Sequence, residues 1–171
     1  MTSNHLNTAE YHQYYKSYID KATSANIVEG LAINLKKGMI FLSEIPEEKH
    51  NYAYADGKWT IKDLLLHIID AERVFAYRAL RIARGDKTPL AGFDQDIYVA
   101  NAHAANRSFK SLIEEYKAVR SSTIALFGSF EEEVLLRIGE ASGSAISVRA
   151  LGYIISGHEN HHMAVIKERY L

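Results

Sequence analysis

The sequence predicts an all-α protein built as a four-helix bundle. Four long segments carry apolar residues at intervals of three and four, which is the period of an amphipathic helix. The 171 residues contain two prolines and a single Asp-Gly pair, so the series of tight turns that a many-stranded sheet needs is missing. Helices with one apolar face each bury those faces best against one another, and four of them form a bundle.

The first 25 residues are predicted to form an N-terminal arm on a bundle domain of residues 26–171. This stretch has few aliphatic residues, so we expect it to pack on the surface of the domain. Its four tyrosines are Tyr11, Tyr14, Tyr15 and Tyr18. The first bundle helix is predicted to begin near Asn26 and to end before Pro46, because the residue before a proline avoids the helical conformation.

The second helix is predicted to run from Thr60 to about Gly85. Thr60 and Asp63 have the spacing of a capping box, and a glycine commonly ends a helix. The segment 86–104 follows, and it is too long for a simple helical hairpin. We therefore expect this segment to cross the end or the face of the bundle.

The third and fourth helices complete the bundle. The inner face of the third begins at Phe109, and Gly128 ends this helix. Ser129 and Glu132 are then predicted to cap a short helical turn. Ser147 is the predicted N-cap of the fourth helix, and no strand is expected in the chain.

Three histidines fall on the predicted inner faces of two helices. His158 and His162 are four residues apart, so their rings project from one face about one turn apart, a spacing that can chelate a divalent ion. His67 lies among apolar residues of the second helix, where a buried polar group needs a partner. The pair alone fits hydrogen-bonded core histidines better, but a third inward ring favours a metal site with open coordination positions.

The positions of these histidines along their helices predict the order in which the helices run up and down in the bundle. His67 lies about seven residues, or roughly 10 Å, from the start of its helix, and His162 lies about seven residues before the end of the last helix. They meet at one height only if the second and fourth helices are antiparallel. This requires an up-down-down-up order, with the segment 86–104 as the crossover between the second and third helices.

Residues 158–162 also match the H-E-x-x-H pattern of zinc peptidases, in which the glutamate is the general base. A peptidase is not favoured, because no strand is predicted that could align a peptide. Glu159 is instead expected at the rim of the site or as a hydrogen-bond partner of a ligand, since it lies about 100° round the helix from His158. His161 is expected to face solvent.

Four further side chains have two interpretations each. Asp63 and Asp70 lie one turn either side of His67, so each could accept a hydrogen bond from its ring. Alternatively, Asp63 caps the helix and Asp70 is solvated. Arg78 and Arg81 could bind an anionic group of a substrate, but we favour pairing with acids such as Asp86 or Asp94, which would fix the crossover. The histidines expected at the surface are His5, His12, His50 and His103.

Composition excludes several classes of function. Without cysteine the chain has no disulfide, thiolate metal site or cysteine nucleophile, so a metal must be bound by histidines and carboxylates. A net charge of −1 offers no surplus for binding a nucleic-acid backbone, and no apolar run has the length of a transmembrane helix. The N-terminus shows no secretion signal. We expect a cytoplasmic protein without nucleic-acid or membrane partners.

The chain resembles the DinB superfamily of DinB/YfiT-like four-helix metalloenzymes over nearly its whole length from about residue 26. The segments that carry the resemblance are Gly57–Lys62 (GKWTIK) leading to His67, Asp70–Arg78 (DAERVFAYR), Ala83–Asp86 (ARGD), Gly92–Asp94 (GFD), Gly157–Glu159 (GHE) leading to His162, and Lys167–Leu171 (KERYL). The resemblance implies a divalent metal, commonly zinc or nickel, at His67, His158 and His162. It also implies an up-down-down-up bundle that often forms a homodimer.

Members of this family include metal-dependent hydrolases and thiol-dependent transferases and isomerases that use bacillithiol, mycothiol or glutathione. The resemblance therefore implies a small-molecule substrate and leaves the hydrolase and the thiol-dependent reactions open. In a thiol-dependent reaction, a low-molecular-weight thiol has to come from outside, because the chain has no cysteine. The alternative is a non-catalytic, stress-related metal-binding module with a structural or vestigial site. The open position of a three-histidine site favours the enzyme, and the sequence assigns no catalytic residue.

Overall fold

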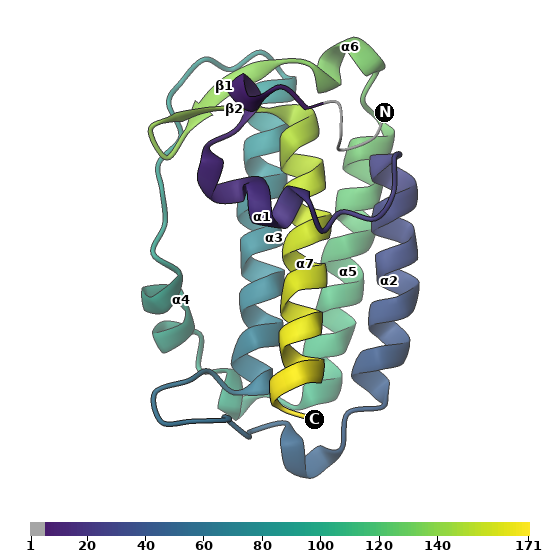
Figure 1. Ribbon diagram of the computed structural model, residues 1–171, viewed down its shortest axis with the longest axis vertical. Helices are drawn as coiled ribbons and strands as arrows, with labels where there is room; N and C mark the ends of the chain where they lie inside the picture. Colours follow the sequence, from purple (N-terminus) through teal and green to yellow (C-terminus); the bar gives the residue numbers. More distant parts are fainter. Residues whose placement is uncertain (1–5) are drawn as a thin grey trace.

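The computed structural model describes residues 6–171, and four long helices dominate it. These are α2 (Ile27–Ser43), α3 (Ile61–Ala83), α5 (Phe109–Gly128) and α7 (Val148–Arg169), which form a bundle (Figure 1). Each contributes a fully buried leucine to the core: Leu31, Leu65, Leu112 and Leu151. The prediction of a mostly helical bundle is confirmed. Within the described range, no helix combines the length and the apolar character needed to cross a membrane.

The helices begin where the sequence places polar caps. Thr60 and Asp63 form the predicted capping box of α3, and the Ser147 side chain accepts a hydrogen bond from the N–H of Ala150 at the start of α7. The short turn after α5 is α6 (Glu132–Leu135), but its N-cap is Glu131 rather than Ser129. Local capping chemistry thus fixes the first residues of α3 and α7, the two helices that carry the three histidines.

Hydrogen bonds between helix ends show the directions of neighbouring helices. The Tyr170 hydroxyl, directly after α7, donates to the carbonyl of Trp59, directly before α3, at 2.7 Å. Arg137, which precedes α7, donates to the carbonyl of Ala83 at the end of α3, at 2.6 Å. Helices α3 and α7 are therefore antiparallel. Helices α3 and α5 run side by side in the same direction (Figure 1).

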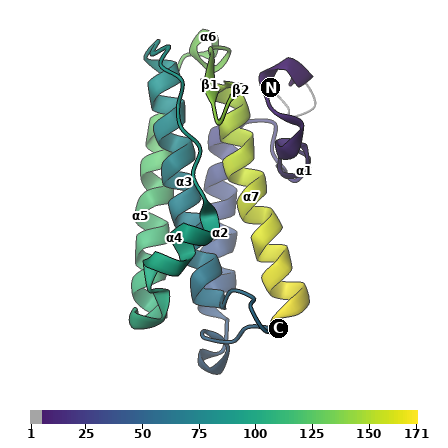
Figure 2. The same cartoon turned by 90° about the vertical axis from the view of Figure 1, so that its left-hand side faces the viewer.

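The connection between α3 and α5 runs along the outside of the bundle from one end to the other (Figure 2). The sequence predicts this long segment but not its internal structure, which includes the helix α4 (Gln95–Ala102) and the 3₁₀ turn Ala104–Asn106. Helix α4 begins because the Asp94 carboxylate accepts hydrogen bonds from the N–H groups of Asp96 and Ile97. It packs against α3.

A β-hairpin precedes α7, and the prediction of a chain without strands is wrong here. Strands β1 (Ile138–Ala141) and β2 (Ser144–Ser147) pair in antiparallel register across a two-residue turn. Ser142 and Gly143 occupy that turn with φ values of 53° and 73°. Positive φ at both positions is the conformation of a tight hairpin turn. The turn is a Ser-Gly pair, which is a weaker sequence signal for a hairpin than Asn-Gly or Asp-Gly.

Residues 6–26 lie across the bundle and pack on α7 (Figure 1). They contain the 3₁₀ turns η2 (Thr8–Glu10) and η3 (Gln13–Tyr15) and the short helix α1 (Lys16–Ile19). The Glu10 carboxylate accepts a hydrogen bond from Arg149 Nε at 2.7 Å. At Gly157 helix α7 and the N-terminal segment approach so closely that a Cβ would lie 1.7 Å from the carbonyl oxygen of Tyr18. Only glycine allows this packing.

Candidate metal centre

Three histidine rings meet inside the bundle between α3 and α7. His67 Nε2 lies 3.0 Å from His158 Nε2, and His162 Nε2 lies 3.1 Å from the same atom. The three rings each offer a nitrogen, and these nitrogens all lie within 4.8 Å of one another. We call His67, His158 and His162 the histidine cluster. The structure thus brings together all three histidines that the sequence singles out.

The backbone explains why the rings meet. His158 and His162 are one turn apart on α7, so both side chains project from the same face of that helix. His67 lies on α3, which runs antiparallel to α7 and packs along it. His67 and His158 are both buried, and His162 is partly buried. Each ring position is therefore set by a packed helix rather than by a mobile loop.

The donor set fits a single small cation. At Zn–N distances of about 2.0–2.1 Å, two imidazole nitrogens of a tetrahedral site lie about 3.3 Å apart, close to the observed separations. Without a cation, His158 Nε2 has one hydrogen or one lone pair with which to satisfy two neighbouring nitrogens. The Nδ1 atom of His162 is also buried, without a hydrogen-bond partner among the described residues.

The environment keeps the three rings neutral. Burial lowers the pKa of His67 to about 4. Burial, followed by the neighbouring His67 and His161 rings, lowers the pKa of His162 to about 3. The pKa of His158 is held well below its ordinary value by burial and then by the other three imidazoles. Neutral imidazole is the form that binds a metal, so no proton has to be removed near pH 7.

Aromatic rings surround the histidine cluster. The Trp59 ring lies 4.9 Å from the His67 ring, measured between centroids. The Tyr18 ring makes an edge contact with His158 at 5.2 Å, and the Phe75 ring lies 6.2 Å from His158. Trp59 therefore packs beside a candidate ligand. These apolar walls lower the local dielectric constant and strengthen any electrostatic interaction made there.

Two cavities reach the cluster. The first, of about 370 Å³, is lined by His162 and by Lys58, Trp59 and Arg169, and we call it the Lys58 cavity. The second, of about 220 Å³, is lined by His67, His158 and several aromatic side chains, three of them from the N-terminal residues. We call it the arm cavity. Each histidine of the cluster thus lines one of the two cavities.

The two aspartates considered as partners of His67 lie elsewhere. The Asp63 carboxylate accepts hydrogen bonds from the N–H and the hydroxyl of Thr60, so its role is to cap α3. Asp70 pairs with Arg73 at 3.4 Å. Burial, partly offset by Arg73, raises the pKa of Asp70. Neither carboxylate has a described hydrogen bond to His67, so the capping interpretation of Asp63 is the one that the structure supports.

The two arginines hold the crossover. Arg81 forms an ion pair with Asp86, as favoured from the sequence. Arg78 is buried and donates from Nη2 to the carbonyl of Ala91 at 2.7 Å and to the hydroxyl of Ser142 at 3.0 Å. It thus joins α3, the crossover and the hairpin turn through backbone and hydroxyl oxygens rather than through an acid. Both arginines thus have partners within the protein, rather than in a substrate.

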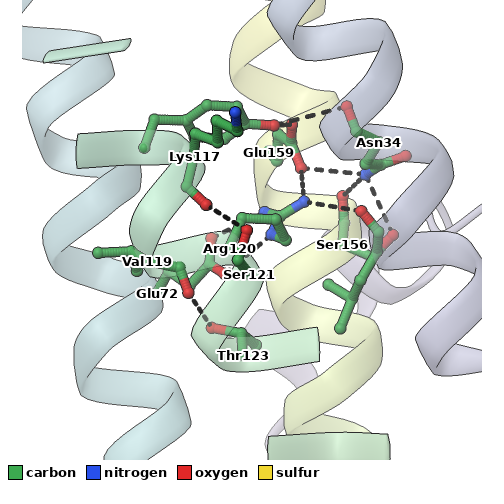
Figure 3. Close-up of polar contacts among 11 residues, drawn as sticks. Asn34, Glu72, Lys117, Val119, Arg120, Ser121, Thr123, Ser156 and Glu159 are labelled. Atoms are coloured by element: carbon green, nitrogen blue, oxygen red, sulfur yellow. Dashed lines mark hydrogen bonds and ion pairs between the residues drawn. The ribbon is translucent and has the colours of Figure 1, made fainter. Parts of the chain in front are cut away.

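Glu159 is neither at the rim nor beside a histidine, and both expectations for it are wrong. It is 1 % exposed and points toward Arg120 of α5 rather than toward the histidine cluster. Figure 3 shows its carboxylate facing Arg120, with Asn34 and Ser156 beside it. Since Glu159 is held there by an ion pair with Arg120, it is not available as the general base of a peptidase. One step of about 100° along the helix separates it from His158.

Arg120 is the centre of a buried network that sequence patterns do not reveal. Its guanidinium donates to both carboxylate oxygens of Glu72, each at 2.8 Å, and also pairs with Glu159. The Tyr116 hydroxyl donates to the second oxygen of Glu159, and Asn34 Nδ2 donates to the first at 3.2 Å. We call these five residues the arginine network. In a helical sequence pattern, a charged residue is normally assigned to the solvent-exposed face. Only the tertiary contacts therefore identify the arginine network.

The remaining histidines do not belong to the histidine cluster. His161 is partly buried rather than exposed, with its ring between Tyr18 and His162. His50 stacks on Phe109 at 3.9 Å, His12 caps a 3₁₀ turn and His103 is exposed. His5 lies outside the described residues. The described part of the chain offers one group of three or more histidine or carboxylate side chains arranged to hold a metal ion.

Comparison with known proteins agrees with this fold and this cluster. The model of the DinB superfamily matches residues 39–166, which is most of the chain and includes all three histidines. The chain belongs to the DinB superfamily. Among known proteins it resembles an Oceanobacillus iheyensis protein named "Putative metal-dependent hydrolase", with 26 % identity over 129 residues, which are 74 % of this chain and 73 % of the relative.

Solved structures share the fold of this DinB-superfamily protein. YfiT from Bacillus subtilis, described as "a probable metal-dependent hydrolase with an unusual four-helix bundle topology", superimposes with a TM-score of 0.71 over 95 % of this chain and 89 % of YfiT, at 15 % identity. A DinB-like protein from Bacillus subtilis superimposes with a TM-score of 0.59 over 82 % of this chain and 86 % of its own, at 21 % identity. At these identities the likeness concerns the fold.

Proposed function

We propose that this DinB-superfamily protein is a metal-dependent enzyme in which His67, His158 and His162 bind one divalent ion. The observation that carries the proposal is the convergence of three neutral ring nitrogens within 4.8 Å at a place that two cavities reach. Three protein ligands leave at least one position free, which is the arrangement of a catalytic rather than a structural metal site. When bound, the ion would supply Lewis acidity for a hydrolase or thiol-transferase reaction.

The ion that we propose is zinc or nickel. Neutral imidazole nitrogens suit both ions, and the cluster contains no oxygen ligand of the kind that magnesium or calcium prefers. The described side chains hold the rings through packing, with Trp59 against His67 and Tyr18 against His158. Such packing fixes ring orientation, which second-sphere hydrogen bonds do in other metal sites.

The substrate that we propose is a small molecule that enters through one of the two cavities. The Lys58 cavity carries the positive side chains Lys58 and Arg169 near His162, and Asp96 is the acid in its lining. Arg169 is held in place because it donates to the Tyr54 hydroxyl at 3.1 Å. The net positive lining of the Lys58 cavity favours a substrate with an anionic group. In a thiol-transferase reaction the thiol would be a low-molecular-weight cosubstrate, because the chain has no cysteine.

The connectivity of the bundle supports this proposal. We infer an up-down-down-up order, in which residues 84–108 return the chain to the starting end of α3 before α5 begins. This order makes α3 and α7 antiparallel neighbours, so that a histidine near the start of α3 meets two histidines in the second half of α7. The homodimer and the cytoplasmic location stay predictions from the sequence.

Metal analysis of protein purified without a histidine tag tests the proposal. We expect close to one equivalent of zinc or nickel in the wild-type protein and almost none in His158→Ala. His161→Ala is the matched control, because it removes a neighbouring imidazole that lies outside the cluster and should keep the metal. Equal metal contents in all three proteins would overturn the site. Hydrolase and thiol-transferase assays on the loaded protein then separate an enzyme from a non-catalytic metal-binding module.

A further inference from the structure

The arm cavity differs in chemistry from the Lys58 cavity. Aromatic rings form much of its wall, among them Tyr15, Tyr18, Phe75 and Phe93, and the candidate ligands His67 and His158 also line it. None of the described residues that line it is an aspartate, glutamate, lysine or arginine. The Lys58 cavity, in contrast, is lined by two cationic side chains and an acid. Two different parts of a substrate can therefore be recognised on the two approaches to the histidine cluster.

The rings of the arm cavity pack edge to face on one another. The Tyr15 and Phe75 centroids are 6.0 Å apart with nearly perpendicular planes, and those of Phe75 and Phe93 are 6.5 Å apart. The volume of about 220 Å³ exceeds the roughly 150 Å³ of an apolar protein cavity that is known to bind benzene. Rings arranged edge to face present both positive edges and negative faces to a bound aromatic ring. The cavity thus has the size and the walls for one such ring.

The N-terminal residues that close this cavity are held by specific contacts. Asn160 Nδ2 on α7 donates to the carbonyl of Lys21 at 2.9 Å, and the Glu10 carboxylate pairs with Arg149. Burial would raise the pKa of Glu10, but hydrogen bonds from Arg149 and from the N–H of Asn7 lower it below its ordinary value, so the pair is charged near neutral pH. Gly157 allows the close approach of the backbone at Tyr18. The N-terminal residues 7–21 lie outside the segment 39–166 that the family model matches.

We propose that the arm cavity binds an aromatic ring of the substrate and places it directly beside the metal position. This inference rests on the proposed function, because the ring is bound next to the ion that the histidine cluster would hold. Tyr15 and Tyr18 are then specificity-determining residues supplied by the N-terminal segment. Gly157 is a positioning residue that acts by letting this segment dock. An anionic group of the same substrate would extend toward Lys58 and Arg169.

Three hydroxamic acids test the inference by calorimetric titration of the zinc-loaded protein. All three share the same metal-binding group, and they carry a methyl, a cyclohexyl or a phenyl substituent. We expect benzohydroxamic acid to bind at least about tenfold more tightly than acetohydroxamic acid, because the ring buries apolar area. It should also bind at least about twofold more tightly than the cyclohexyl compound, because edge-to-face contacts require an aromatic ring.

Two variants connect this preference to the N-terminal segment. Gly157→Ala should displace residues 7–20, which faster hydrogen exchange of their amides would report, and Tyr15→Ala removes one ring without forcing that displacement. Both should keep the affinity for acetohydroxamic acid and lose most of the advantage of the phenyl compound. Tyr52→Ala is the matched control, because Tyr52 is an exposed tyrosine that lines neither cavity.

The outcomes separate this inference from the proposed function. Binding of acetohydroxamic acid without any advantage for the phenyl compound would overturn the inference and leave the metal site intact. A cyclohexyl compound that binds as tightly as the phenyl compound would overturn the aromatic assignment. Failure of all three acids to bind the zinc-treated protein would overturn the proposed function, and the inference with it.

Discussion

His158 and Glu159 are neighbours on α7, yet they belong to two buried polar groups of opposite character. Glu159 lies in the arginine network, where each described charge has an opposite charge or a hydrogen-bond partner. His158 lies in the histidine cluster, where three neutral nitrogens face one another and share one hydrogen-bonding atom. The first group is complete as a protein structure. The second has more buried nitrogens than partners for them, and this difference supports the proposed metal site.

Electrostatics reinforces the contrast. In the arginine network, burial alone would lower the pKa of Arg120, but Glu159 and Glu72 outweigh burial and raise that pKa well above its ordinary value. Burial and the Glu159 carboxylate likewise raise the pKa of Tyr116, so it stays a hydrogen-bond donor. In the histidine cluster nothing opposes burial, and all three pKa values fall. One group retains its charge through its partners, and the other loses it.

The largest effect is expected from breaking the complete group. Arg120→Ala would leave Glu72 and Glu159 as unpaired buried carboxylates, which costs about 3–5 kcal/mol of unfolding free energy. Urea denaturation of the wild-type and variant proteins measures this loss. Arg73→Ala is the matched control, because it removes an arginine that pairs with Glu115 at the surface, and such pairs contribute about 0.2–1 kcal/mol. Similar losses in both variants would show that the network carries no special stability.

A smaller effect is expected from completing the incomplete group. A divalent ion that binds only the folded protein stabilises it by about 2.7 kcal/mol at a concentration one hundred times its dissociation constant. Thermal denaturation of metal-free protein should therefore show a higher Tm after zinc is added, and a chelator should reverse the rise. His158→Ala should show no such rise. The same rise in that variant would place the bound ion elsewhere.

The smallest of the three effects is a loss of stability of the metal-free protein in mild acid. His67 has a pKa of about 4 in the folded protein against an ordinary value of 6.5, so below pH 6.5 the unfolded chain binds a proton that the folded protein does not. Stability is therefore fully present above pH 6.5 and is lost as the pH falls toward 4. At pH 5 one such histidine accounts for up to about 2 kcal/mol.

Urea denaturation of metal-free protein at pH 7 and pH 5 measures this difference. His67→Leu should lose less stability between these two values than the wild-type protein, because one of the three buried imidazoles no longer takes part. An equal or larger loss in His67→Leu would show that its ring is protonated as readily in the folded state as in the unfolded state.

The prediction from sequence succeeds where the signal is local. The capping box of Thr60 and Asp63, the N-cap Ser147 and the three inward histidines follow from spacing along single helices, and the structure contains all of these features. It fails where distant segments decide. Glu159 has the position of a rim residue in the helical pattern, but Arg120 draws it into the core. The hairpin depends on a Ser142-Gly143 turn that carries a weaker signal than Asn-Gly.

The sequence by itself determined the helices, their caps, the family and the residue types that could bind a metal, because helical periodicity and capping act over a few neighbouring residues. Only the tertiary structure decided which polar residues meet. It placed Glu72, Arg120 and Glu159 together from three helices, and it brought tyrosines from the N-terminal segment beside His158. The physical reason is that burial makes a polar group depend on its partners, and those partners come from parts of the chain that no local pattern connects.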